Sequence, residues 1–169
     1  MKKALIVIDI QNEYFLGGKF PLWNPEMALD TTLELIDLAK KQNIPVVLIR
    51  HVLGVDSPFF TPESSGVMIH QKILEAVPSA PVINKQYADS FYKTELEAVL
   101  NRFGVEHIVL CGMMTQNCVT HTALSKSAEK YKVSIVADAC ATVSDAIHTI
   151  AVDALVPREI LTSLDVLAQ

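Results

Sequence analysis

An apolar run from Ile108 to Cys111 that stops at Gly112 constrains the fold of this chain more than any other feature. The run is too short for a helix, and its β-branched residues favour a strand that is buried on both faces. Residues 115–117, Thr-Gln-Asn, are of types that cap helices, and Cys118 then opens a segment of helical character. The local prediction is a strand, a tight turn and a helix, with the Cys118 thiol near the helix N-terminus.

Apolar runs of this kind recur along the chain and alternate with helical segments. Strands are predicted at residues 4–8, 45–49, 82–84 and 133–137, with a brief one near 159–161. Helices are predicted at residues 25–42, near 69–77, at 94–103, from the 115–117 cap to about 131, and at 144–155. This alternation predicts an α/β fold: an open, mostly parallel six-stranded sheet with helices on both faces, a Rossmann-like three-layer sandwich. We expect residues 1–169 to form one domain.

Capping patterns mark the starts of three of these helices. Asn24 precedes Pro25, which suits an N-cap followed by proline at the first helical position. Thr94 and Glu97 have the spacing of a capping box, in which each side chain bonds the backbone N–H of the other residue. Ser144 is the predicted N-cap of the helix that follows the fifth strand.

Composition argues against nucleic-acid binding and membrane insertion. The net charge is −5, which supplies no basic surface, and no segment reaches the roughly 18 uncharged apolar residues of a membrane span. The N-terminal run MKKALIVIDI is interrupted by Asp9 and lacks a cleavage site, so we interpret it as a strand and expect a cytoplasmic protein. Three cysteines without a CxxC pair suit reduced thiols better than disulfides.

Three chemically reactive residues follow three different predicted strands: Asp9, Lys85 and Cys118. Parallel sheets bind ligands at the C-terminal ends of their strands, so the fold brings these residues to one edge. An N-terminal helix position and a nearby ammonium both favour the thiolate, and a carboxylate can take the thiol proton. The pattern therefore predicts a Cys/Asp/Lys triad. Taken singly, each residue also has a structural explanation: a buried thiol, a loop-capping carboxylate and a surface charge.

The motifs around these residues resemble those of a known family. The stretches VIDIQN around Asp9, INKQYADSF around Lys85 and GMMTQNCV around Cys118 resemble the isochorismatase-like cysteine hydrolases, which include nicotinamidases and related amidases. The resemblance implies that Asp9 shuttles protons, that Lys85 is its electrostatic partner and that Cys118 is the nucleophile that forms a thioester. It also implies a cis peptide bond between Met113 and Met114, which aims the backbone N–H groups of Met114 and Cys118 at a developing oxyanion.

The chain departs from the metal-dependent nicotinamidases. These carry an Asp-x-His-x-His pattern after the second strand, where this chain has only one histidine, His51. A zinc site needs three or four well-spaced ligands, and His51, Asp56 and His70 do not supply them. We therefore expect no catalytic metal and no cofactor. Family members that cleave an enol ether lack the nucleophilic cysteine, so the presence of Cys118 favours amide chemistry.

Several residues near the predicted active edge keep two interpretations. The aromatic residues are expected either to line an apolar pocket for a small amide substrate or to pack in the core; they are Phe15, Trp23, Tyr87 and Phe91. Gln11 either supports Asp9 and the loop behind it or lies in solvent. The apolar composition and the habit of the family predict a homo-oligomer, a dimer or larger.

The function predicted from the sequence is metal-independent hydrolysis of a small carboxamide or carbamoyl compound with release of ammonia. The alternative is a non-catalytic member in which the fold serves as a ligand-binding or assembly module. A thiol-redox role is a weaker third interpretation, because no second cysteine lies within CxxC reach of Cys118.

Overall fold

A computed structural model describes residues 1–156 and 158–167 of the chain; residues 157, 168 and 169 of the predicted domain lie outside this description. The described residues form one six-stranded sheet in which each pair of neighbouring strands is parallel, with the order β3-β2-β1-β4-β5-β6. The strands are β1 Lys3–Ile8, β2 Val46–His51, β3 Val82–Lys85, β4 His107–Met113, β5 Lys132–Ala141 and β6 Glu159–Leu161. The predicted fold class is confirmed.

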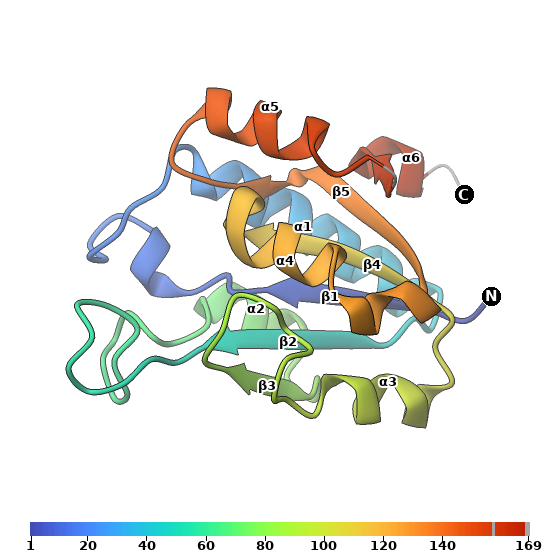
Figure 1. The fold of residues 1–169 in the computed structure, drawn as a ribbon, viewed down its shortest axis with the longest axis horizontal. Coiled ribbons are helices and arrows are strands. Elements are labelled where there is room, and N and C mark those ends of the chain that lie inside the picture. Colours follow the sequence, from blue (N-terminus) through green and yellow to red (C-terminus); the bar gives the residue numbers. More distant parts are fainter. Residues whose placement is uncertain (157, 168–169) are drawn as a thin grey trace.

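Helices cover both faces of this sheet (Figure 1). They are α1 Pro25–Lys41, α2 Gln71–Ala76, α3 Leu96–Phe103, α4 Thr120–Ala123, α5 Asp145–Asp153 and α6 Ser163–Leu167. Figure 1 shows α1 behind the sheet and α3 and α4 in front of it. Side chains of β1 alternate between the two cores: Leu5 and Val7 pack with α1, whereas Ile6 and Ile8 pack with α3 and α4. Burial on both faces explains why the strands read as continuous apolar runs.

The strand order reverses between β1 and β4, which are hydrogen-bonded neighbours at the centre of the sheet. The chain proceeds outward from β1 to β2 and β3 and then returns across the sheet to β4. Ligands of open α/β sheets bind outside the C-terminal strand ends at such a reversal. In Figure 1 these strand ends point to the left, where the loops at residues 9–24 and 52–70 lie.

Two predicted helix starts differ in their local chemistry. Asn24 does precede α1, with Pro25 at its first position, but Asn24 has a left-handed φ of 52° and its side chain makes no capping bond. The predicted capping box of Thr94 and Glu97 is wrong. Thr94 Oγ1 accepts from the backbone N–H of Leu96, and Glu97 pairs instead with Lys130. Neither side chain makes the reciprocal bond of a capping box, because their partners are Leu96 and Lys130 instead.

The predicted cap of α5 is confirmed, because Ser144 Oγ accepts from the backbone N–H of Ile147. Three predicted strand ends were too early: β2 continues past Ile49 to His51, β4 past Gly112 to Met113, and β5 past Asp138 to Ala141. The predicted single helix after Met114 is instead three short pieces, a π-helical turn at Thr115–Val119, then α4, then a 3-10 turn at Lys126–Lys130.

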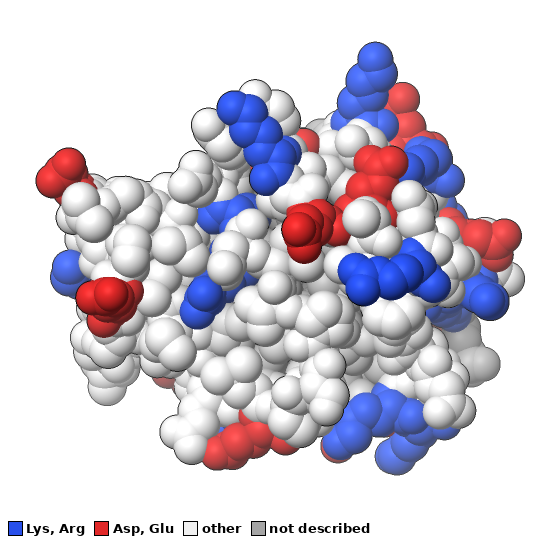
Figure 2. Space-filling view, turned by 90° about the horizontal axis from the view of Figure 1, so that it is seen from below, with Lys and Arg blue, Asp and Glu red and all other residues white. Residues whose placement is uncertain are grey.

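The surface mixes charges of both signs. On the face shown in Figure 2, Lys and Arg side chains lie among Asp, Glu and uncharged ones. Within the described parts of the chain, no helix has the length and apolar character needed to cross a membrane.

Gly112 permits the close approach of β4 to β1. Its φ is +124°, and a Cβ built there would lie only 2.0 Å from the carbonyl oxygen of Ile8, the residue it faces in the register of the two strands. Only glycine avoids both the conformational strain and this backbone clash. Because Gly112 has no side chain, β1 and β4 lie close together at this point. Asp9, which follows β1, is therefore close to the turn after β4 that carries Cys118.

Replacing Gly112 with alanine should destabilise the fold by roughly 3 kcal/mol or more, because backbone has to move to relieve the clash. Urea denaturation measures this change. Gly54→Ala is the matched control, since a Cβ at Gly54 meets nothing within 4 Å, and its unfolding free energy should shift by no more than about 0.5 kcal/mol. Equal stability of the two variants would contradict the packing role of Gly112.

Candidate active site

The three residues singled out from the sequence meet at the C-terminal edge of the sheet. Asp9 follows β1, Lys85 ends β3 and Cys118 lies in the helical turn after β4. Lys85 Nζ lies 2.9 Å from Asp9 Oδ2, and Cys118 Sγ lies within 4.8 Å of a carboxylate oxygen of Asp9. Asp9 and Cys118 are completely buried and Lys85 is 2% exposed. The structure thus brings together all three members of the predicted triad.

The backbone of Asp9 turns sharply at the end of β1. Its φ of 49° lies in the left-handed region, which is uncommon for a residue other than glycine. The N–H of Asp9 donates to the carbonyl of Ile49 in β2, and its carbonyl accepts from the N–H of Gln11. Among the residues that the structure describes, Asp9 Oδ1 has no hydrogen-bond partner. One oxygen of the carboxylate therefore faces Lys85, and the other is a free acceptor.

The Lys85 ammonium is surrounded by acceptors. Besides Asp9, its Nζ donates to the backbone carbonyls of Tyr87 at 3.0 Å and Ala88 at 3.3 Å, and it lies 3.3 Å from His51 Nδ1. Burial lowers the pKa of Lys85, but the combined effects of the Asp9 carboxylate and Cys118 outweigh it and raise the pKa above the ordinary value. Lys85 is therefore a charged group at neutral pH.

The Cys118 thiol differs from the prediction of an intrinsically favoured thiolate. The pKa of Cys118 is raised to about 12: burial contributes most, the Asp9 carboxylate adds to it, and the Lys85 ammonium only partly opposes these effects. The position near a helix N-terminus does not overcome desolvation, because the thiol has no exposed surface. The resting side chain is a neutral thiol, so ionisation requires transfer of its proton to a neighbouring base.

His51 is a member of this cluster that the sequence analysis considered only as a metal ligand. It is the last residue of β2, the strand between those that carry Asp9 and Lys85. Its Nδ1 lies 3.7 Å from Cys118 Sγ and 3.8 Å from Asp9 Oδ2. The sequence prediction ended this strand at residue 49, two residues short. His51 was therefore not recognised as a strand-end residue on the same edge as Asp9 and Lys85.

Gln11 and Phe60 fix the position of His51. Gln11 is completely buried, which overturns the solvent-exposed interpretation. Its side chain accepts from the N–H of His51 and donates to the carbonyls of His51 and Val67. Phe60 stacks on the His51 ring at a centroid distance of 5.5 Å and an interplanar angle of 9°. Gln11 thus supports the site through His51 and the loop at residues 52–70.

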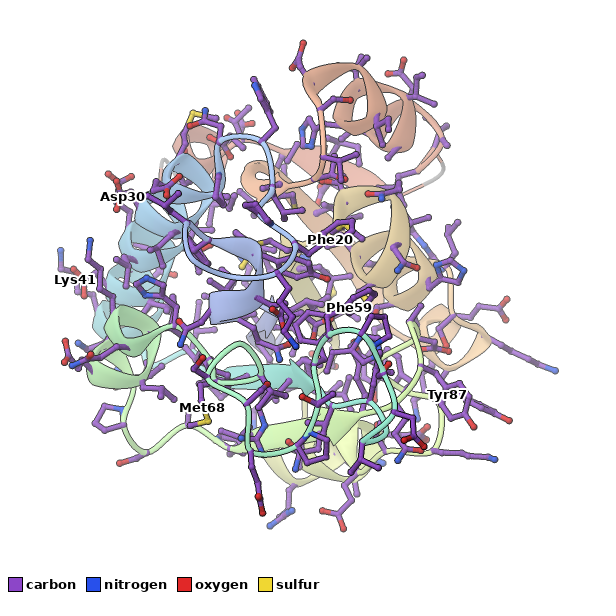
Figure 3. The ribbon with its side chains drawn as sticks, turned by 90° about the vertical axis from the view of Figure 1, so that its left-hand side faces the viewer. Phe20, Asp30, Lys41, Phe59, Met68 and Tyr87 are labelled. Atoms are coloured by element: carbon purple, nitrogen blue, oxygen red, sulfur yellow. The ribbon has the colours of Figure 1, made fainter. Side chains whose placement is uncertain are left out.

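An aromatic cover of four rings in mutual contact lies against His51, and it consists of Tyr14, Phe20, Phe59 and Phe60. Figure 3 looks onto this edge of the sheet and shows Phe20 and Phe59 side by side near the centre, from two different loops. Glu13, itself buried, ties the loops together: its carboxylate accepts from the N–H groups of Lys19 and Phe60. Burial raises the pKa of Tyr14 well above its ordinary value, and the charges of Asp9 and Cys118 add to this effect.

The four aromatic residues predicted near this edge do not form one wall. Phe15 is buried with its ring 4.7 Å from that of His70, and Phe91 is buried and stacked on Tyr131. Trp23 is 45% exposed and bridges to Thr142 through its backbone. Tyr87 is also 45% exposed, with its ring against Tyr92 at 4.9 Å. For Phe15 and Phe91, packing accounts for the position.

The peptide bond between Met113 and Met114 is cis. The carbonyl of Met114 accepts from the N–H groups of Asn117 and Val119, which shapes the turn that carries Cys118. The oxyanion role of the Met114 and Cys118 N–H groups stays a prediction.

The arrangement does not fit a resident metal ion. Asp9, His51 and Cys118 each bring one ligand atom within 4.8 Å of the others, a spacing at which an ion can bind. However, the Lys85 ammonium lies 2.9 Å from Asp9 and 3.3 Å from His51, so a second cation would face strong repulsion. The positive charge that faces Asp9 and His51 is the Lys85 ammonium instead of a metal ion.

Comparison with known proteins identifies the family of this chain. The family model for the isochorismatase domain matches residues 3–164. The chain belongs to the isochorismatase family. It is 38% identical over 160 residues to the uncharacterised isochorismatase family protein YddQ of Bacillus subtilis, covering 94% of this chain and 86% of that protein. It is also 27% identical to Nicotinamidase 3 of Arabidopsis thaliana, covering 86% of this chain and 76% of that one.

A solved structure extends the family assignment to three dimensions. The crystal structure of a candidate isochorismatase hydrolase from Oleispira antarctica superimposes with a TM-score of 0.91 at 31% identity, covering 99% of this chain and 97% of that one. The protein is thus an isochorismatase-family hydrolase with the α/β fold of that family.

Removing the Lys85 charge should destabilise the protein strongly. Lys85→Met leaves the Asp9 carboxylate buried and unpaired, a change that costs roughly 3–5 kcal/mol. The double variant Asp9→Asn/Lys85→Met should regain most of that loss, because neither charge is then left alone. Urea unfolding at neutral pH measures both; additive effects of the two substitutions would show that the pair is not coupled.

The reactivity of Cys118 should report the charges around it. Because Asp9 raises the thiol pKa, Asp9→Asn should lower it, so the pH at which methyl methanethiosulfonate begins to label Cys118 should fall. In the wild type, labelling should rise with pH well above the range of a free thiol, since the pKa is about 12. Peptide mapping separates Cys118 from the buried Cys111 and Cys140. A wild-type profile like that of free cysteine would contradict this description of the site.

Proposed function

We propose that this protein is a cysteine amidohydrolase that needs no metal and cleaves the C–N bond of a small carboxamide or carbamoyl compound, releasing ammonia. The observation that carries the proposal is the buried Asp9–Lys85 ion pair beside the Cys118 thiol, with one Asp9 oxygen left as a free acceptor. A protonated thiol needs a base, and a base with an unused acceptor lies within reach.

In the acylation step, the Cys118 thiol proton passes to Asp9 and the sulfur attacks the carbonyl carbon of the amide. The C=O π electrons move to oxygen, and the oxyanion is stabilised by the backbone N–H groups of Met114 and Cys118, a contribution of roughly 3 kcal/mol per donor. Asp9 then returns the proton to the nitrogen, the C–N bond breaks and ammonia leaves. The acyl group remains on Cys118 as a thioester.

In the deacylation step, Asp9 takes a proton from water while the water oxygen attacks the thioester carbon. The C–S bond breaks, the acid product leaves, and the proton returns from Asp9 to the Cys118 sulfur. Asp9 thus carries one proton in each half-reaction. Lys85 carries none; its fixed positive charge keeps Asp9 ionised and stabilises the transient thiolate.

The relatives support amide chemistry without specifying the substrate. Nicotinamidase 3 is one of the curated relatives of this chain, and its name denotes hydrolysis of an amide. The aromatic cover and the complete burial of Cys118 favour a small substrate of low polarity outside its amide group. The same closed cover is the observation that favours the alternative, a non-catalytic ligand-binding module.

Screening small carboxamides for ammonia release tests the proposal. Turnover should require Cys118, and Asp9→Asn should lower kcat by at least about a hundredfold, since proton transfer by a positioned group contributes that much. The acyl-enzyme should be visible by mass spectrometry as a mass added to the Cys118 peptide and removed by hydroxylamine.

Cys140→Ala is the matched control, because Cys140 is also buried but lies in β5, and this variant should keep its turnover. Ammonia release that persists in Cys118→Ala would refute the nucleophile. Binding of an amide without turnover or acyl-enzyme, in a folded wild type, would instead establish the non-catalytic module.

A further inference from the structure

His51 has no part in the steps above, yet it lies against every group that takes part in them. Its residue surface is 9% exposed, and its Nδ1 faces Lys85 Nζ at 3.3 Å and Cys118 Sγ at 3.7 Å. Its other ring nitrogen, Nε2, is buried and has no hydrogen-bond partner among the described residues. A buried polar atom without a partner is expensive in a folded protein and calls for an explanation.

The neighbours of His51 determine which nitrogen carries the proton. Burial lowers the pKa of His51, and the Lys85 charge adds to this lowering against the opposing effects of Asp9 and the Gln86 backbone, so the imidazole is neutral at pH 7. A charged ammonium has no lone pair and can only donate, so Nδ1 beside it has to be the acceptor. The single ring proton therefore sits on Nε2. The unpartnered atom is a hydrogen-bond donor.

Gln11 and Phe60 fix the orientation of the His51 ring. Gln11 holds the backbone of His51 at both its N–H and its carbonyl, and Phe60 lies parallel to the ring. Asp9 Oδ1, the second unpartnered atom of the cluster, is an acceptor. The cluster thus keeps one buried donor, His51 Nε2–H, and one buried acceptor, Asp9 Oδ1, without a hydrogen-bond partner among the described residues.

We propose that His51 orients the substrate: its Nε2–H donates to an acceptor atom bonded next to the reacting carbon. The carbonyl oxygen of the scissile amide is taken by the backbone N–H groups and its nitrogen faces Asp9, so the His51 donor needs a second acceptor. This narrows the substrates to carboxamides with a carbonyl or ring nitrogen beside the scissile group. The assignment of the ligand class rests on the proposed amidase function; the role of His51 does not.

The protonation state of His51 is the first test. Long-range ¹H–¹⁵N correlation spectra of the ¹⁵N-labelled protein distinguish the two neutral tautomers and the charged ring, and His51→Asn identifies the His51 signals among the five histidines. The expected result at neutral pH is a protonated Nε2 and an unprotonated Nδ1. A proton on Nδ1 would overturn the inference, since Nδ1 then cannot accept from Lys85 or the thiol.

Two alkylating probes test the donor without any turnover. In iodoacetamide the reacting CH₂ is bonded to a carbonyl, whereas allyl iodide has a similar size and no acceptor. With either probe the Cys118 sulfur forms a bond to CH₂, iodide leaves with the bonding electrons, and the thiol proton passes to Asp9. The measured quantity is the labelling rate with iodoacetamide divided by the rate with allyl iodide, and this ratio is divided by the same ratio for N-acetylcysteine. Changes in thiol ionisation affect both probes alike and cancel. The normalised ratio therefore reports recognition of the acceptor.

Two variants separate the nitrogens of His51. The amide of glutamine reaches the position of Nε2 and keeps a donor there, whereas the shorter asparagine keeps an acceptor near Nδ1 only. Wild type and His51→Gln should prefer iodoacetamide, and His51→Asn should lose at least about tenfold of that preference, the factor that corresponds to about 1.4 kcal/mol. His121→Asn, at an exposed histidine, is the control and should match the wild type.

The outcomes distinguish this inference from the proposed function. If His51→Asn keeps the wild-type preference while amides are hydrolysed, the orienting role is wrong and the amidase proposal stands. If the preference follows His51 but no amide is hydrolysed, the amidase proposal fails and His51 remains a recognition residue. Thermal unfolding shows whether each variant is folded, and the iodoacetamide ratio is compared only among folded variants.

Discussion

The ion pair between Asp9 and Lys85 is the interaction on which the rest of the site depends. Transferring two charges from water to a completely buried position costs several kcal/mol for each ion, which only close contact and further hydrogen bonds offset. The contact here is 2.9 Å, and the carbonyls of Tyr87 and Ala88 and the His51 ring nitrogen Nδ1 also lie within 3.3 Å of the ammonium. The segment after β3 therefore has to return toward the sheet and present its backbone oxygens. Burial of the pair is what gives its charges strong effects on Cys118.

This burial also sets the protonation of the nucleophile. A thiol with a pKa of about 12 is protonated at neutral pH, so the protein stores a proton on sulfur and a negative charge on Asp9. Chemistry starts when that proton moves, and a substrate that expels water from the cluster strengthens every interaction inside it. The low polarity that suppresses the free thiolate therefore serves the proposed reaction, because charge appears only where a fixed ammonium can stabilise it.

Backbone packing delivers the groups that the ion pair acts upon. Gly112 allows β4 to approach β1 so closely that no side chain fits between them, and the turn carrying Cys118 starts three residues later. Glu13 and Gln11, both buried, hold two loops against the strand ends by bonding to backbone groups. The bond between Glu13 and Phe60 joins residues 47 apart in the sequence, and the bond between Gln11 and Val67 joins residues 56 apart.

The sequence by itself determined the order of strands and helices and the meeting of Asp9, Lys85 and Cys118. Short apolar runs rich in β-branched residues favour buried strands, and parallel connections leave their C-terminal ends on one edge, so residues directly after three strands were expected to converge. The tertiary structure alone decided the rest. It placed His51 in the site, because the true end of β2 depends on pairing with β3 rather than on local composition. It paired Glu97, a predicted helix cap, with Lys130. It also raised the pKa of Cys118. Both effects depend on neighbours that are distant along the chain.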